Sequence, residues 1–299
     1  MRAVRGPAQL TRKSKFLVVG TALVVLAGTV VLADAEQSPA TTADSAGAQP
    51  STSETLQEVT VTAKHLKLDW SQRNELIQKA ATFVFGIAAV SSYNEYPPRW
   101  FAPVCPLVTG LPREQGEFVL GRISEIARAA GAPLGGEHCH PNLFIYVTAQ
   151  PKGLLRAMFG NATPLRVDEF IDTPRPVRVW HNIYEVPAGK MAIPGRINAR
   201  AWAIGPVYVV VDRAHLHAVS QGQLADYVGM VGLAGIRFPP HLGDAQTILR
   251  LFDGIPPAAP EGLSDWDQAF LNMLYHPEPS LATPRSLMAR RMVVELVPR

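Results

Sequence analysis

The sequence carries little net charge of either sign. Its formal net charge is +3 over 299 residues, and five of its cationic side chains lie within the first 15 positions. Removing residues 1–35 takes away these five cations and one acid, Asp34, which leaves a net charge of about −1. Proteins that bind nucleic acid through counterion release need a basic surface. Nucleic acid is therefore excluded as an expected partner.

Complete catalytic and cofactor motifs are also lacking. Ser220 is not flanked by the residues of a nucleophile elbow. Glycines occur singly or in short clusters such as Gly135-Gly136, and they do not form a phosphate-binding loop ahead of a helix. The sequence thus predicts no cofactor and no metal, and it assigns no catalytic residue by motif alone.

Cysteine is scarce, with Cys105 and Cys139 standing 34 positions apart. Each lies beside a predicted strand, and in an oxidising compartment the two are expected to form a disulfide. Closing a loop of this size stabilises a fold by about 3 to 4 kcal/mol in the chain-entropy model. Two alternatives to the disulfide stay open: free thiols, and a metal site at His138-Cys139-His140. The second is disfavoured because adjacent residues of an extended chain point to opposite sides.

The N-terminus has the pattern of an export signal. Five basic residues, the last of them Lys15, precede an uncharged run from Phe16 to Ala33. The run approaches the roughly 20 residues that span a bilayer, so residues 16–33 could stay as a membrane anchor. Ala33-Asp34-Ala35 matches a signal-peptidase site and would give a mature chain that starts at Glu36. We expect an exported protein, either periplasmic or anchored in the inner membrane with its domain in the periplasm.

The remaining chain divides into a linker and a domain. Residues 36–57 are rich in Ser, Thr, Ala and Pro without an apolar period, which predicts a disordered linker. Residues 58–299 are expected to form a single mixed α/β domain of the α+β class. Its first part, with strands at 106–110 and 142–148 and a helix at 112–130, predicts a parallel βαβ unit.

Further elements are indicated by apolar periodicity and caps. A helix is expected over residues 69–90, with Ser71 as its cap and Leu76, Ala80, Phe83 and Ile87 on its buried face. Strands are expected at 177–180 and 206–211, a strongly apolar helix at 221–236 and a short helix at 245–252. Ser264 with Asp267 forms a capping box for a last helix that ends at Tyr275.

Two helices carry a resemblance to a known class of enzymes. The segment Leu224–Leu233 is similar to the HExxHxxG helix of zincin metallopeptidases, with Asp226 at the general-base position and Gly232 matching the glycine. The segment Gly262–Asp267 and the pair Leu274-Tyr275 resemble the closing helix of metzincins. The resemblance implies a three-layer zincin-like scaffold. Residues 68–280, including Trp100 and Cys139-His140-Pro141-Asn142, also resemble a group of exported proteobacterial proteins of unknown function.

The departures from the zincin pattern fall on the metal ligands. Two imidazoles one helical turn apart are needed to hold zinc, and here those positions are Ala225 and Gly229. A third ligand would be expected near Gly235, which has no donor atom. Ala225, Gly229 and Gly232 instead form a stripe of small residues, which allows another element to approach closely. The resemblance therefore predicts a degenerate scaffold whose former metal face is packing surface.

His215 and His217 are the other candidates for chemistry. With Asp212 or Asp226 they could form a site of nitrogen and oxygen ligands if the segment is extended. Two functions are thus carried forward. The first is a non-catalytic binding or scaffold protein that holds an envelope protein, a peptide or a cell-wall component in a cleft beneath the helix at 225–232. The alternative is a hydrolase of the peptidase class with a rearranged site around Asp226, His215 and His217.

Overall fold

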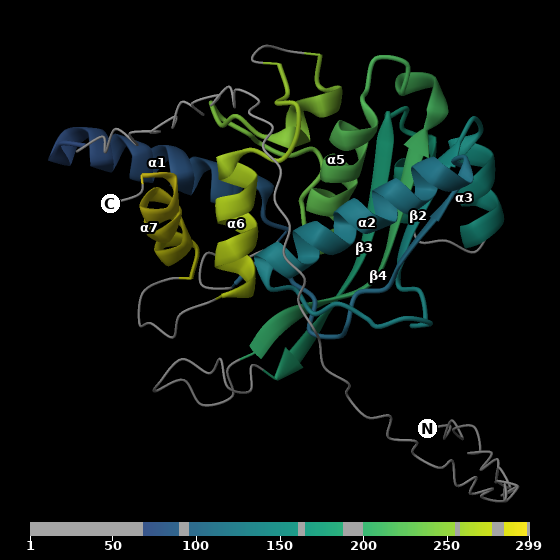
Figure 1. Cartoon of the computed structure of the whole chain (residues 1–299), viewed down its shortest axis with the longest axis horizontal. Coiled ribbons are helices and arrows are strands. Elements are labelled where there is room, and N and C mark those ends of the chain that lie inside the picture. Colours follow the sequence, from purple (N-terminus) through teal and green to yellow (C-terminus); the bar gives the residue numbers. More distant parts are fainter. Residues whose placement is uncertain are drawn as a thin grey trace, which may run out of the picture. The chain divides into compact units, whose positions relative to one another are not determined.

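A four-stranded mixed sheet organises the fold (Figure 1). Its strands are β1 (Pro106–Thr109), β2 (Leu143–Thr148), β4 (Arg200–Asp212) and β3 (Val177–Pro187), in that spatial order. β1, β2 and β4 run parallel, and β3 is antiparallel to β4. The mixed α/β class predicted from the sequence is confirmed.

The computed structural model describes residues 68–89, 96–160, 165–187, 200–254, 258–276 and 284–297. All of them belong to one compact unit that spans residues 61–299. The expected export segment at 1–35, the possible anchor at 16–33 and the linker at 36–57 lie outside these ranges. Within the ranges, no helix combines the length and the apolar character needed to cross a membrane.

The predicted βαβ unit is confirmed. β1 and β2 pair in parallel, with Pro106 opposite Leu143, and α2 (Arg113–Ala130) connects them. Gly131 ends the helix in the left-handed conformation, at φ 75°, which glycine adopts without steric cost. The buried face of α2 is the one that the apolar spacing predicts: Val119, Ile123, Ile126, Ala127 and Ala130.

Cys105 and Cys139 form the predicted disulfide, with their Cα atoms 5.9 Å apart. Cys105 lies directly before β1 and Cys139 on the approach to β2. Asn142 reinforces the same junction, because its Oδ1 accepts a hydrogen bond from the backbone N–H of Cys105 at 2.7 Å. Because the disulfide engages the sulfur of Cys139, no thiolate is left for a metal site at His138-Cys139-His140.

Helices cover both faces of the sheet. One face, carrying alternate residues of β2 and β4 such as Ile145 and Val209, belongs to the main apolar core. The opposite face contacts α3 (Pro151–Phe159) and α4 (Leu165–Asp172) through a smaller cluster centred on Val210. These two short helices were not predicted, since this region was expected to be irregular.

Three further helices, α1, α6 and α7, belong to the unit, and several predictions need correction. α1 (Trp70–Ile87) is capped by Asp69 and not by Ser71, because the Asp69 carboxylate accepts from the N–H of Gln72. α6 (Asp265–Tyr275) has the predicted capping box at Ser264. α7 (Pro284–Leu296) was not predicted. The short helix expected at 245–252 is a 3₁₀ helix, η3 (Ile248–Phe252).

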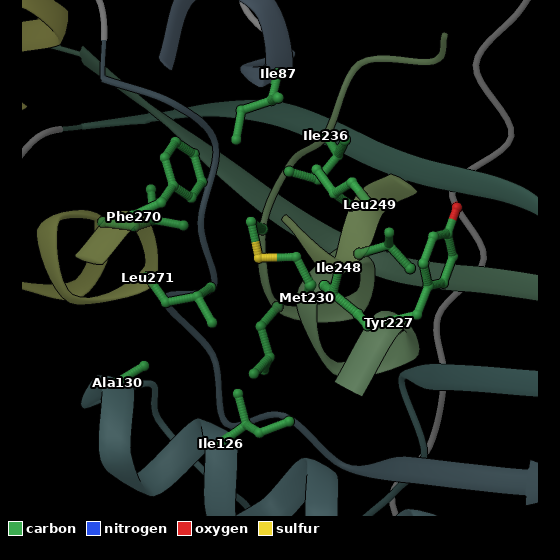
Figure 2. Close-up of a cluster of buried hydrophobic side chains, with 14 of the residues drawn as sticks. Ile87, Ile126, Ala130, Tyr227, Met230, Ile236, Ile248, Leu249, Phe270 and Leu271 are labelled. Atoms are coloured by element: carbon green, nitrogen blue, oxygen red, sulfur yellow. The ribbon is translucent and has the colours of Figure 1, made fainter. Parts of the chain in front are cut away.

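α5 (Gln221–Leu233) lies at the centre of the main core, and every residue from 224 to 233 is buried. A helix that is apolar on all sides is stable only when other elements surround it. Figure 2 shows how they do so around Met230, with Ile126 from α2, Phe270 from α6 and Ile248 from η3 grouped near it.

The last carbonyls of α5 accept hydrogen bonds from side chains of three separate parts of the chain. The indole of Trp100 donates to Gly232 O at 2.8 Å, and the phenol of Tyr275 donates to Leu233 O at 2.5 Å. Nε2 of His181, on β3, lies 2.7 Å from Val231 O. Because a carbonyl only accepts, this nitrogen carries the proton. The final turn of a helix leaves its carbonyls without partners inside the helix, and here these side chains supply them.

We predict that His181 makes the protein sensitive to mild acid. Burial lowers the pKa of His181 from 6.5 to about 4. Neutral His181 therefore contributes stability that is fully present above pH 6.5 and is lost as the pH falls toward 4, by at most about 3 kcal/mol. Chemical unfolding between pH 7 and pH 4.5 should show a smaller loss in His181→Gln, which keeps a donor for Val231 O. The exposed His217→Gln is the matched control and should follow the wild type. An equal loss in wild type and His181→Gln would contradict this assignment.

Candidate functional site

Asp226 lies in the first half of α5, at a position set by the start of that helix. Ser220 and Gln223 form a capping box there: the Ser220 hydroxyl accepts from the N–H of Gln223, and the Gln223 side chain accepts from the N–H of Ser220. Such caps stabilise a helix end by about 1 kcal/mol. The Asp226 side chain is 3% exposed, so it needs partners inside the protein.

Its main partner is Arg122 on α2. Nε of Arg122 lies 2.5 Å from Oδ1 of Asp226, and Nη2 lies 3.1 Å from Oδ2, which gives a two-pronged ion pair. A third contact joins Nη1 to Glu125 at 3.3 Å. The hydrogen bond that Arg122 donates to Asp226 raises the pKa of Arg122 further above its usual range. This pair joins α2 to α5. Sequence analysis did not predict it, because its two residues stand 104 positions apart.

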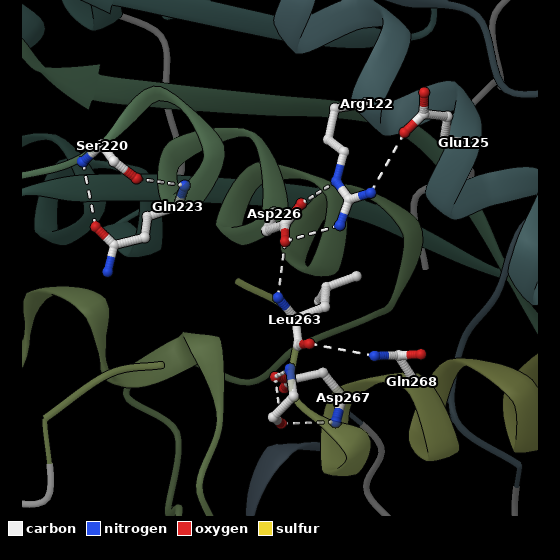
Figure 3. A network of polar contacts seen from close by, with 9 residues as sticks. Arg122, Glu125, Ser220, Gln223, Asp226, Leu263, Asp267 and Gln268 are labelled. Atoms are coloured by element: carbon white, nitrogen blue, oxygen red, sulfur yellow. Dashed lines mark hydrogen bonds and ion pairs between the residues drawn. The ribbon is translucent and has the colours of Figure 1, made fainter. Parts of the chain in front are cut away.

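The Asp226 carboxylate also holds the loop before α6. The backbone N–H of Leu263 donates to Oδ2 at 2.7 Å (Figure 3). The preceding residue, Gly262, makes this approach possible, since a Cβ there would lie 2.6 Å from Oδ2. The carboxylate thus accepts three hydrogen bonds, and each of its oxygens accepts at least one.

Asp267 is a second buried carboxylate in the same region. Oδ2 accepts from the backbone N–H groups of Ile248 and Ser264 and from the Ser264 hydroxyl, and Oδ1 accepts from the Thr247 hydroxyl. Burial raises the pKa of Asp267, and these hydrogen bonds oppose that rise. Asp267 thus joins η3 to α6, and the two carboxylates bind consecutive backbone N–H groups of the loop before α6: Asp226 binds that of Leu263 (Figure 3) and Asp267 that of Ser264.

The small-residue stripe of α5 faces neighbouring elements. A Cβ on Gly229 would lie 2.6 Å from Cδ1 of Ile126 on α2, and one on Gly232 would lie 2.9 Å from Leu143 on β2. Ala225 is fully buried. The expected cleft beneath the helix at 225–232 is therefore wrong, because α2 and β2 occupy that space.

His215 and His217 lie before α5, on a connection that starts with the 3₁₀ turn η2 (Arg213–His215). Both are exposed; Nδ1 of His215 lies 3.7 Å from Asp212, and Nδ1 of His217 lies 3.0 Å from Ala214 O. Among the described residues, no three His, Cys, Asp or Glu side chains are grouped so that they could hold a metal ion. The oxygens of Asp226 bind Arg122 and Leu263, and neither histidine contacts them.

A hollow of about 240 Å³ lies beside the ion pair, between α2 and α6. Arg122 and Glu125 line it on the α2 side, and Gln268 and Asn272 on the α6 side. Its apolar wall is formed by Ile126, Ala129, Ala130, Leu263 and Leu271. A concave surface with apolar walls and a few polar groups is the usual setting for a ligand or a peptide side chain.

Comparison of the chain with protein-family models, with curated proteins and with solved structures gives no match in any of the three.

We predict an asymmetric response when the ion pair is broken. Arg122→Met leaves the buried Asp226 charge with the Leu263 N–H as its remaining donor and should lower the free energy of unfolding by about 3 kcal/mol. Asp226→Asn leaves the charge on half-exposed Arg122, which stays hydrated, and should cost less. The double variant should be more stable than Arg122→Met alone, because no buried charge remains.

Denaturant unfolding of the four proteins measures this coupling. Arg113→Met removes an exposed pair with Glu117 on the same helix and serves as the control, with no expected shift of the midpoint. Additive losses in the double variant would show that the two side chains do not stabilise each other.

Proposed function

We propose that this chain is an exported cell-envelope protein that binds a partner without catalysis. It uses a degenerate zincin-like scaffold in which the metal positions serve packing. The proposal depends on the hydrogen bonds that the Asp226 carboxylate accepts within the protein. A general base must have a free oxygen within reach of a water or a substrate. Both oxygens of this carboxylate instead accept hydrogen bonds from Arg122 and Leu263.

The small-residue stripe supports the same proposal. Imidazoles at 225 and 229 would be needed to hold zinc on this helix. The space that a side chain at 229 would enter is filled by Ile126, and Ala225 is buried. The alternative of a peptidase that uses Asp226, His215 and His217 would require these three groups to converge, and their contacts point to different partners.

The hollow between α2 and α6 is the binding surface that we assign to this function. It offers a guanidinium, a carboxylate and two side-chain amides around an apolar wall. Peptides present backbone amides and short side chains that match such a set of donors and acceptors. A protein segment or a wall peptide of the envelope is therefore the proposed partner.

The double variant Ala225→His with Gly229→His tests whether the former metal face is closed. Each imidazole should overfill its contact at a cost of about 1 to 3 kcal/mol, so the variant should be less stable than the wild type and gain no zinc. Thermal unfolding with and without zinc measures both the stability of the variant and its zinc binding, since a ligand that binds the folded state raises the midpoint.

A matched control lies on the exposed side of α2. Glu117→His with Gly121→His places the same pair one turn apart, and a Cβ on Gly121 would meet nothing within 4 Å. This control should keep its stability and show a zinc-dependent rise of the midpoint. If the variant at 225 and 229 behaved like the control, the metal face would be open, and the hydrolase alternative would gain support.

A further inference from the structure

The lining of the hollow between α2 and α6 carries unbalanced negative charge. Arg122 lines the hollow, and the buried Asp226 carboxylate balances the charge of this guanidinium. Glu125 also lines it, with a side chain that is 63% exposed. Asp265, another exposed acid, is the first residue of α6, the helix that forms the opposite wall. Arg128, three residues after Glu125, does not line the hollow. A ligand group of positive charge is therefore complementary to this surface.

The polar groups of the lining favour a hydrogen-bond donor in the same place. Nε2 of Gln268 donates to Leu263 O at 3.2 Å, which leaves the side-chain oxygen of Gln268 as an acceptor. Figure 3 shows this oxygen directed away from Leu263. One oxygen of Glu125 accepts from Nη1 of Arg122 at 3.3 Å, and the other is a further acceptor. An ammonium or guanidinium group donates to both kinds of oxygen.

The apolar wall suits the carbon chain of a basic residue. Ala129 and Ala130 of α2 and Leu271 of α6 belong to this wall. Lysine and arginine side chains bury their methylene groups along apolar surface while the charged end stays in water or against an acid. The wall and the acceptors together match one long basic side chain.

Phe118 extends the same face of α2 beyond the hollow. Its residue is 47% exposed, and it stands four positions before Arg122, so both lie on one side of the helix. From Phe118 to Glu125 the helix rises about 10 Å, which corresponds to about three residues of an extended peptide. One peptide can therefore contact the ring with an apolar residue and reach the hollow with a basic one.

We propose that the peptide partner places a basic side chain, lysine or arginine, in the hollow between α2 and α6. The carbon chain lies along the apolar wall, and the charged end pairs with Glu125 and donates to the Gln268 oxygen. An apolar residue of the same peptide contacts Phe118. This inference rests on the proposed function and adds the chemical class of the partner to it.

Selection of a phage-displayed library of random peptides on the full chain tests the inference. We expect the enriched peptides to carry lysine or arginine about three positions from an apolar residue. Glu125→Gln should remove the enrichment of basic residues, because it removes the unbalanced charge. Glu117→Gln alters an exposed acid of α2 that does not line the hollow, and this matched control should select basic peptides as the wild type does.

Fluorescence polarisation with a synthetic copy of the enriched peptide measures the pairing. Glutamine in place of its basic residue should weaken binding by about two- to fivefold, the range of an exposed ion pair. Glu125→Gln should weaken binding of the basic peptide equally and leave binding of the glutamine peptide unchanged. Phe118→Ala should weaken both by at least about fivefold. Trp70→Ala, which removes an exposed ring on α1, should bind as the wild type does.

Ala129→Trp separates failure of this inference from failure of the proposed function, because it places a large ring in the hollow and should abolish binding of the enriched peptide. Enriched peptides without a basic residue, with binding that Ala129→Trp abolishes, would overturn the inference and leave the binding function in place. Additive effects of Glu125→Gln and of the glutamine peptide would do the same. No enriched peptide, or binding that Ala129→Trp leaves unchanged, would overturn both.

Discussion

The burial of α5 on every side is the constraint on which the rest of the structure depends. A helix surrounded by other elements cannot use water to satisfy its polar groups, so the protein must supply each partner. The carbonyls of its last turn accept from Trp100, His181 and Tyr275. Its single carboxylate, Asp226, accepts from Arg122 and Leu263. These contacts join α5 to α2, to β3, to α6 and to the chain segments between them.

The same constraint leaves no room for larger side chains at two of the α5 positions to which the resemblance to zincins refers. In a metal site the helix face must stay open so that two side chains and a water can meet at the ion. Here Gly229 and Gly232 lie so close to Ile126 and Leu143 that even a methyl group would meet them. Close packing and an open metal site need opposite shapes at these positions, and the residues of this chain fit packing.

Local signals in the sequence predicted much of the fold correctly. The face of α2, the βαβ unit, the disulfide and the Ser264 capping box all follow from periodicity, from terminator residues and from spacing. Two short helices, α3 and α4, escaped prediction because eight or nine residues give little periodicity. The cap of α1 was placed two residues too late, since Asp69 and Ser71 are both good capping residues.

The site could not be predicted because its contacts are long-range. The resemblance to a zincin motif pointed to Asp226, but the role of this residue depends on its contacts with Arg122 and Leu263. Periodicity predicts that Arg122 lies on a helix, and it does not indicate that Arg122 or Leu263 contacts Asp226. The hollow between α2 and α6 also depends on tertiary packing, because its lining residues come from two helices that are far apart in the sequence.

We infer that the Asp226 carboxylate has a structural role and takes no part in chemistry. Amide hydrogen exchange at Leu263 tests it most directly, because this N–H lies in a loop before α6 and bonds to the carboxylate. We expect Leu263 to exchange as slowly as the amides in the middle of α5, since both require the contact between α2 and α5 to open. Exchange at the rate of an exposed loop amide would show that the carboxylate does not hold this N–H, and the structural role of Asp226 would then be wrong.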